Sequence, residues 1–222
     1  MKSIRAKLAR LAAAVVASLI VATSAYASTV IVDYSGGAEG PGLAMELTDA
    51  GIFQTAGGAA VQSLLNWADF IPVADGLGKV KITNVALTGV ADSSIPGVYA
   101  QQTTGGKIEL FDLSDTLLLS VAFTDGLLEE TASGVGSQFT VGTSTFGGPL
   151  GAYLVPTSAS HSLSLVNFTP AGINQDTKQL SAGSGFGNGL VNGDQSRVPE
   201  PMTLLLLGSG LVSGIAARRK AA

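Results

Sequence analysis

The side chains of this sequence that could perform chemistry are few. His161 is the only histidine and there is no cysteine, which excludes disulfides, thiolate metal sites and cysteine nucleophiles together. A serine-based triad would have to use His161, and no G-x-S-x-G elbow is present. His161 also shares the parity of Leu163 and Leu165 in an alternating run, which predicts a half-buried structural histidine. The sequence therefore disfavours a serine hydrolase.

Carboxylates gather locally at Asp112-Leu-Ser-Asp115 and at Glu129-Glu130. A calcium ion takes six to eight oxygen ligands, and neither an EF-hand loop nor a nonapeptide repeat supplies them here. Solvated turn carboxylates are the favoured interpretation, and calcium held between strand-connecting loops stays open. Paired carboxylates also hydrolyse glycosides, but no spacing selects one pair among the acidic residues. We assign no catalytic residue, no cofactor and no metal ligand.

Three further patterns have weak links to binding. Residues 183–189 (Gly-Ser-Gly-Phe-Gly-Asn-Gly) lack the lysine, preceding strand and following helix of a phosphate loop. Asn167-Phe168-Thr169 matches a glycosylation sequon, and a chance match is the favoured interpretation. Carbohydrate binding uses exposed aromatic platforms, and the aromatic residues of the body are few enough for its core to use them all. Apart from phenylalanines they are Trp67, Tyr34, Tyr99 and Tyr153.

The charge of the chain is divided between its ends and its body. Residues 28–197 hold five cations against fifteen carboxylates, a balance of −10, although the whole chain has a net charge of −4. Such an acidic body repels phosphate backbones, so nucleic-acid binding is excluded as a function class. Without cysteine, the body has to be stabilised by its apolar core, or by bound ions and partners.

Period-2 alternation and glycine-rich turns predict an all-β body. The clearest run buries Leu119, Val121 and Phe123 on one face. A change of phase across Thr83-Asn84 predicts a bulge. Turn chemistry is expected at Gly105-Gly106 and Asp125-Gly126. These features indicate an antiparallel, jelly-roll-like β-sandwich of about eight strands; the strands are expected at 29–34, 43–48, 79–90, 107–111, 116–124, 137–142, 150–155 and 161–168.

Two segments of the body are expected to differ from this pattern. Val61, Leu64, Leu65 and Ala68 share one helical face, which predicts a helix over 61–70, with Trp67 sealing one end of the sandwich. Residues 174–197 are polar and rich in glycine, as flexible spacers are. The domain organisation is therefore a sandwich at 28–173 followed by a linker at 174–197.

The N-terminus has the three parts of a secretory signal. Four cations in the first ten residues precede an uncharged run over 11–22. Ala25-Tyr26-Ala27 then offers the small residues that signal peptidase requires, which places the cut after Ala27. We expect residues 1–27 to form a signal helix that is removed, and the mature chain to begin at Ser28.

The C-terminus combines a proline-bounded entry, an apolar run and a basic end. Pro199 and Pro201 keep the backbone around Glu200 extended. Residues 202–217 carry no charge and reach ~24 Å as a helix, slightly short of a ~30 Å hydrocarbon core. A basic cluster ends the chain and stops transfer by the positive-inside rule; it consists of Arg218, Arg219 and Lys220.

This tail, residues 198–222, resembles the PEP-CTERM sorting signal of Gram-negative bacteria. Pro199, Glu200 and Pro201, the apolar helix and the basic end occur in the order of that signal. The resemblance covers only the tail, and leaves the fold of the body aside. It implies export, transient insertion of 202–217 in the inner membrane, and processing by exosortase near the Pro-Glu-Pro. A permanent tail anchor is the alternative.

The resemblance also implies a cell surface or extracellular matrix rich in exopolysaccharide. The leading hypothesis is a non-enzymatic surface or matrix protein of a biofilm, whose partners are signal peptidase and exosortase during export and exopolysaccharide afterwards. A carbohydrate-binding module is the alternative, and a secreted glycan-active enzyme the third.

Overall fold

Alternating apolar residues organise the described part of the chain into twelve strands. The computed structural model describes residues 29–36, 42–133, 135–169 and 171–196. The strands there are β1 (Thr29–Gly36), β2 (Leu43–Leu47), β3 (Ile52–Thr55), β4 (Val61–Trp67), β5 (Gly76–Thr83), β6 (Val85–Ala86), β7 (Val98–Phe111), β8 (Leu117–Thr131), β9 (Val135–Val141), β10 (Ser144–Gly147), β11 (Ser160–Thr169) and β12 (Gly183–Gly193). Three 3-10 turns accompany them: η1 (Ala56–Gly58), η2 (Pro149–Tyr153) and η3 (Pro156–Ser158).

Several of these strands are the two halves of a longer strand. β1 and β2 pair with successive parts of β12. In the same way, β4 pairs with β1 and β3 pairs with β2. On the next side, β5 pairs with β4 and β6 pairs with β3. Further along, β9 and β10 both pair with β8. When the halves are joined, eight long strands follow one another, each antiparallel to the next. The pairing of β12 with β1 closes the sheet on itself.

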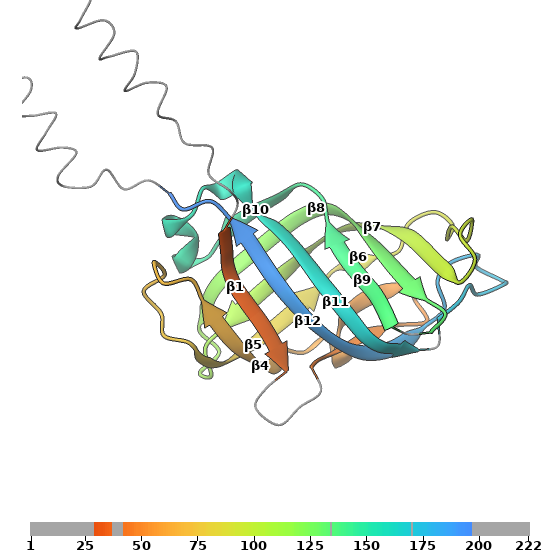
Figure 1. Cartoon of the computed structure of the whole chain (residues 1–222), viewed down its shortest axis with the longest axis horizontal. Coiled ribbons are helices and arrows are strands. Elements are labelled where there is room, and N and C mark those ends of the chain that lie inside the picture. The colour runs from red at the N-terminus through yellow and green to blue at the C-terminus, as the bar shows by residue number, and fades with distance from the viewer. Residues whose placement is uncertain (1–28, 37–41, 134, 170, 197–222) are drawn as a thin grey trace, which may run out of the picture.

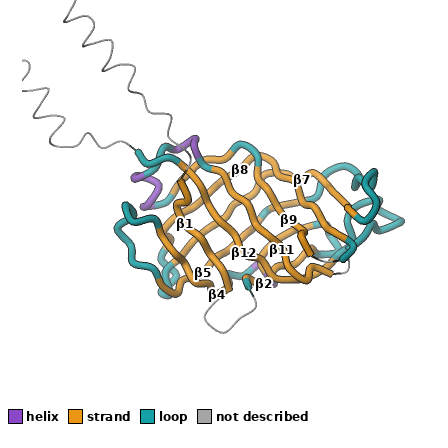
Figure 2. Tube along the Cα trace, viewed as in Figure 1, coloured by secondary structure: helices purple, strands orange, loops and turns teal. Residues whose placement is uncertain are grey.

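The all-β, antiparallel class predicted from the sequence is confirmed, and the eight long strands match the expected number. The arrangement differs from a jelly roll, because one closed sheet replaces two stacked sheets. The reason lies in the connections: each long strand pairs with its neighbours in sequence, whereas sandwiches of this kind need Greek-key crossovers. Figure 2 shows the strands of the near wall crossing those of the far wall.

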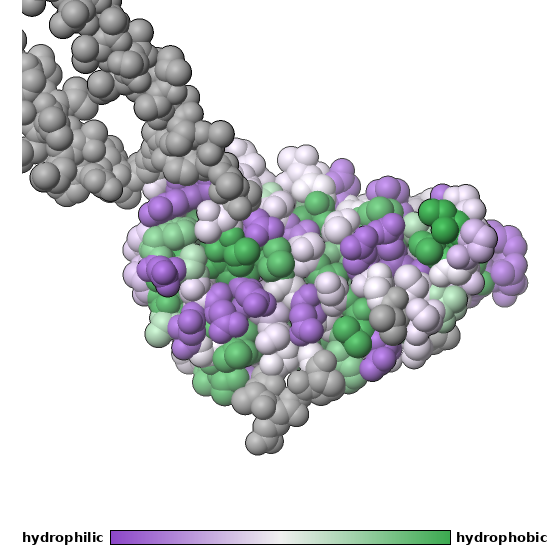
Figure 3. All heavy atoms as spheres, in the orientation of Figure 1, coloured by the Kyte–Doolittle hydropathy of each residue, from purple (hydrophilic) through white to green (hydrophobic). Residues whose placement is uncertain are grey.

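The closed sheet has an apolar interior. Leu119, Val121 and Phe123 on β8 are buried as the alternation predicts. Phe139 on β9 lies near the middle of the core, with its ring centre 5.0 Å from that of Phe53 and 5.8 Å from that of Phe123. An eight-stranded closed sheet is just wide enough for side chains to fill. The outer surface is mixed, with hydrophobic and hydrophilic residues interspersed over the face in Figure 3.

The helix predicted for 61–70 is wrong, because residues 61–67 form strand β4. The pattern that suggested a helix also fits a strand: Ser63, Leu65 and Trp67 are buried at every second position. Short apolar runs do not distinguish the two periods, and here pairing with β1 and β5 decides. The strand expected at 150–155 is wrong too, since the 3-10 turn η2 occupies residues 149–153.

The flexible linker predicted for 174–197 is also wrong over most of its second half. Residues 183–193 form β12, which pairs with β1, β2 and β11 and closes the sheet. Its glycines have a packing reason. A Cβ at Gly187 would lie 2.8 Å from Leu163 Cδ1, and one at Gly189 would overlap the ring of Tyr34. Glycine here lets large side chains pack directly on the backbone of β12.

Two predicted turns lie inside long strands. Gly105-Gly106 falls within β7 and Asp125-Gly126 within β8. A Cβ at Gly106 would lie 2.6 Å from Val85 Cγ2, and one at Gly126 would lie 2.8 Å from Phe139 Cε2. By contrast, the change of phase expected at Thr83-Asn84 is confirmed: buried positions pass from Val80 and Ile82 to Val85 and Leu87 across Asn84, whose φ is 63°. The bulge inferred from it is not seen, because the register with β7 is the same on both sides: Thr83 pairs with Lys107 and Leu87 with Thr103.

The closed sheet has two ends that are shut by different segments. At one end β1 begins and β12 ends, beside η2 and η3 (Figure 1). We call this the exit end, because the described chain stops there at residue 196. At the opposite end, the distal end, residues 87–97 and 171–182 cover the opening.

Candidate functional site

The histidine lies inside the sheet rather than half-buried. His161 on β11 is 3% exposed, and its Nε2 shares a hydrogen bond with the hydroxyl of Tyr34 on β1. Burial lowers the pKa of His161 to about 3 and raises the pKa of the Tyr34 phenol. The phenol is therefore protonated and donates to Nε2, so the imidazole proton is on Nδ1. Nδ1 has no hydrogen-bond partner among the described residues.

This arrangement does not suit acid–base catalysis. A general base needs a pKa near the working pH and contact with a reacting group. His161 has neither, because its Nε2 is occupied by Tyr34 and its ring packs on Phe139, with centroids 6.4 Å apart. His161 is a buried structural residue, as its parity with Leu163 and Leu165 suggested.

The two glutamates of the Glu129-Glu130 pair face opposite ways. They are neighbours on β8, where successive side chains alternate between the two faces of the sheet. Glu129 points outwards and accepts a hydrogen bond from Gln138. Glu130 points inwards and is fully buried, and neither of its carboxyl oxygens has a hydrogen-bond partner among the described side chains and backbone groups. The pair is therefore not a shared carboxylate site.

Glu130 has an unusual electrostatic environment. Desolvation raises the pKa of its carboxyl to about 7; the nearby Gly172 backbone, which does not reach hydrogen-bond geometry, acts weakly in the opposite direction. A carboxyl in apolar surroundings favours its neutral form. No ion pair reaches Glu130 within the described ranges. At neutral pH the group is thus divided between its charged and neutral forms beneath the segment 171–182.

The Asp112–Asp115 cluster is a turn between β7 and β8. Asp112 Oδ1 accepts hydrogen bonds from the backbone N–H of Ser114 (2.9 Å) and Thr116 (2.8 Å), which lower the pKa of its carboxyl. Asp115 instead pairs with Lys79 at 2.7 Å. Across the described segments, no group of three or more His, Cys, Asp or Glu residues lies close enough to hold a metal ion.

Most of the aromatic residues are used by the core. Tyr34 is fully buried and Trp67 is 8% exposed, whereas Tyr99 is partly buried against the core. Tyr153 is the large aromatic side chain in the described ranges with a substantial exposed fraction, 41%. A row of exposed aromatics that could stack on a long glycan is therefore absent from the described surface.

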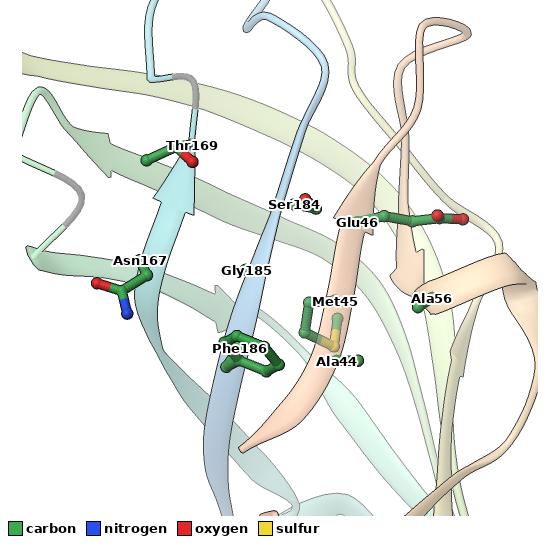
Figure 4. A pocket seen from close by; sticks show the side chains of 9 residues that line it. All are labelled: Ala44, Met45, Glu46, Ala56, Asn167, Thr169, Ser184, Gly185 and Phe186. Atoms are coloured by element: carbon green, nitrogen blue, oxygen red, sulfur yellow. The ribbon is translucent and has the colours of Figure 1, made fainter. Parts of the chain in front are cut away.

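A groove on the outside of β2, β11 and β12 is the candidate binding site (Figure 4). Its volume is 320 Å³, at the small end of ligand pockets. The Phe186 ring lies in the middle of the floor, between Asn167 on β11 and Ala44 on β2. A bulge in β11, where Asn167 has a φ of 54°, sets Asn167 on the rim.

The groove joins one aromatic ring to several hydrogen-bonding groups. Its polar lining consists of Glu46, Asn167, Thr169 and Ser184. Glu46 Oε1 accepts a hydrogen bond from Gln54 at 2.7 Å, which leaves its other oxygen for a ligand. Sequence reasoning missed this site: it classed the Gly-rich run as linker and Asn167 as a chance sequon. An aromatic residue inside an alternating glycine run, as at Phe186, was the available signal.

The sorting signal itself lies outside the described residues. It comprises the Pro199-Glu200-Pro201 motif, the apolar run 202–217 and the basic cluster 218–220; the signal-peptidase site at Ala25 and Ala27 also lies outside them. Residues 197–220 match the family model of the PEP-CTERM protein-sorting motif. These residues are a PEP-CTERM sorting motif. The match confirms the resemblance, and covers the tail but not the body.

The PEP-CTERM motif implies that the protein is exported and sorted by exosortase to the cell surface. No curated protein and no solved structure was found to match the chain. None of the helical segments in the described ranges is long and apolar enough to cross a membrane. The comparisons thus assign the route of the protein, and the work of its body is a separate question.

Proposed function

We propose that this protein is a non-enzymatic component of the cell surface or extracellular matrix, associated with exopolysaccharide and biofilm. The sorting motif supports delivery to that compartment. The observation that carries the non-enzymatic part is the state of the reactive side chains. His161 is sealed in the core by Tyr34, and the buried Glu130 has no partner with which to form a catalytic pair.

The test of this proposal is hydrolysis of the producer's own polysaccharide. Purified protein from Ser28 to Ser196 should release no reducing ends from it, and deletion of the gene should weaken the matrix without changing polysaccharide chain length. Hydrolysis that is abolished by one carboxylate substitution would support the third hypothesis, a glycan-active enzyme, and overturn the proposal. Mass spectrometry of the protein from cells would locate both processing sites.

The groove of Figure 4 favours a second candidate function, carbohydrate binding. The face of a sugar ring packs on an aromatic side chain, and its hydroxyls bond to planar amide and carboxylate groups. Phe186, Asn167 and Glu46 offer these groups within one groove. The groove's size and its single ring suit one sugar unit of a neutral glycan, since the acidic body repels anionic chains.

A glycan pull-down separates the two candidates. Retention of the protein on the producer's polysaccharide should be lost in Phe186→Ala if the groove binds sugar. Tyr153→Ala is the matched control, since Tyr153 is also an accessible aromatic but lies outside the groove. Equal retention of both variants and the parent protein would exclude the groove as the site.

A further inference from the structure

At the exit end, a short segment holds the last described residues of the chain. This segment, residues 149–158 with η2 and η3, is called the clasp. Val155 N–H donates to the carbonyl of Asp194 at 2.8 Å, and Ser196 N–H donates to the carbonyl of Tyr153 at 2.7 Å. Leu154 and Gln195 form an antiparallel bridge between these two bonds. The chain is therefore fixed to the body up to Ser196.

The clasp is itself tied to the body. Leu154 is 2% exposed and belongs to the core. Ser158 Oγ accepts a hydrogen bond from the Asp194 N–H at 2.7 Å and donates one to the Val155 carbonyl at 2.9 Å. One hydroxyl thus links the clasp to the end of β12. The point at which the chain leaves the body is set by these contacts.

The distance from this point to the apolar run of the tail is short. Five residues, 197–201, separate Ser196 from Met202, where the uncharged run begins. The six residue steps from Ser196 to Met202 span at most ~21 Å when fully extended. The interfacial layer on each side of the hydrocarbon core is about 5–7 Å thick. While the apolar run is in the membrane, the exit end must therefore lie beside the membrane surface.

The exit end presents apolar side chains where that surface would be. Tyr153 and Val155 are 41% and 36% exposed, and the backbone of each forms a hydrogen bond with residues 194–196. Val30, which pairs with Asn192 near the end of β12, is 45% exposed. Tyrosine is enriched at membrane interfaces, since its ring is apolar and its hydroxyl stays in the polar layer.

We propose that the exit end, through Val30, Tyr153 and Val155, rests on the periplasmic surface of the inner membrane while the tail holds the precursor there. The occupant of this surface is the lipid interface. The clasp then presents Pro199-Glu200-Pro201 close to the membrane surface, because only two residues of the sequence separate Ser196 from the motif. The proposal depends on the sorting function assigned by the motif.

Hydrogen exchange of the full chain in vesicles tests the contact. With vesicles of phosphatidylethanolamine and phosphatidylglycerol, amides of 149–158 should exchange several-fold more slowly than in detergent. A flexible spacer of about 12 Gly and Ser residues after Ser196 adds ~20 Å of reach and should remove this protection. Equal exchange in vesicles and detergent would overturn the proposal. Protection that arises only after exosortase is added would also overturn it, in favour of a protein partner.

Processing in the producing cells gives a second readout. Tyr153→Ser/Val155→Ser should slow the conversion of precursor to mature protein several-fold. Val90→Ser/Ile95→Ser is the matched control, because Val90 and Ile95 are exposed apolar residues at the distal end. Unchanged processing of the exit-end variant, with an unchanged melting temperature, would contradict the proposal. Deletion of 199–222 tests the sorting function separately: unchanged accumulation of the protein at the cell surface without the tail would refute that function itself.

Discussion

The two ends of the closed sheet are shut in different ways. At the exit end the backbone of residues 194–196 is hydrogen-bonded to the clasp, and the Ser158 hydroxyl joins the two. At the distal end Leu180 closes the opening and donates its N–H to the buried Gln101 side chain. Beneath the same segment, however, Glu130 is buried without a hydrogen-bond partner. The exit end ties the chain to the body with hydrogen bonds, whereas the distal end buries a carboxyl that has no such bond.

The comparison extends to titration, since each half of the described sheet buries one side chain whose ordinary pKa lies below 7. His161 follows the clasp on β11, and Glu130 lies at the distal end. The folded state keeps His161 neutral with a pKa of about 3, below its ordinary 6.5, so stability falls as the pH falls below 6.5. It raises the pKa of Glu130 from 4.5 to about 7, so stability falls as the pH rises from 4.5 to 7. Between pH 4.5 and 6.5 the contribution of His161 to stability rises with pH, whereas that of Glu130 falls.

The largest effect is expected where the two ends are joined, on β12. In Gly189→Val a side chain would have to occupy the space of the Tyr34 ring. Since β12 closes the sheet, we expect a loss of more than about 4 kcal/mol in the free energy of unfolding, or no folded protein. Urea denaturation measures it. Gly76→Ala is the control: a Cβ at Gly76 meets no atom within 4 Å, so its unfolding midpoint should change little.

β12 is also where sequence reasoning failed. The alternation of Leu119, Val121 and Phe123, and the run around Leu163, predicted strands correctly because large apolar residues mark the buried face. In β12 the buried positions include Gly187, Gly189 and Gly193, and the bulk that fills the core there belongs to the neighbouring strands. Because several of its buried positions are glycines, β12 has the composition of a linker although it is a strand of the closed sheet.

The candidate site was predictable only in part. The sequence placed His161 on the same face of its strand as Leu163, since parity is a local property, but it did not show that His161 is fully buried. The burial of Glu130 apart from Glu129 could not be foreseen. The two residues are adjacent in sequence, and their side chains point to opposite faces only because both belong to strand β8. The groove around Phe186 depends on the register between β2 and β12, which pairs Phe186 with Ala44. Register between distant segments is not visible in one sequence.

Glu130→Gln should remove the cost of burying a carboxyl at the distal end. At pH 3 the variant and the parent protein should be about equally stable, because the carboxyl is then neutral in the folded and the unfolded state. Above pH 7 the variant should be more stable by about 3 kcal/mol, as a pKa difference of ~2.5 corresponds to 1.36 kcal/mol per unit. Denaturation at a series of pH values measures the difference. Glu129→Gln, on the outer face of the same strand, is the control: its difference in unfolding free energy from the parent protein should not change with pH.

His161→Gln tests the opposite slope in the exit half. The parent protein loses stability on acidification because the unfolded chain binds a proton that the buried imidazole refuses. The free energy of unfolding of the variant, measured relative to that of the parent, should therefore rise by about 2 kcal/mol as the pH falls from 6.5 to 5. This change does not depend on how stable the variant is at neutral pH. Tyr34→Phe keeps the buried imidazole and should keep the slope. A difference independent of pH would show that folding does not lower the pKa of His161.

The smallest effect is expected for the clasp, since one hydroxyl is removed at a half-buried site. Ser158→Ala loses the acceptor of the Asp194 N–H and should lower the free energy of unfolding by about 1 kcal/mol. The local effect should be greater: amides of 194–196 should exchange faster while those of β8 stay unchanged. Ser94→Ala removes a comparable exposed bond to Asp92 at the distal end and should leave 194–196 as they are. Unaltered exchange at 194–196 in Ser158→Ala would mean that the backbone bonds to Tyr153 and Val155 hold the exit end without the hydroxyl.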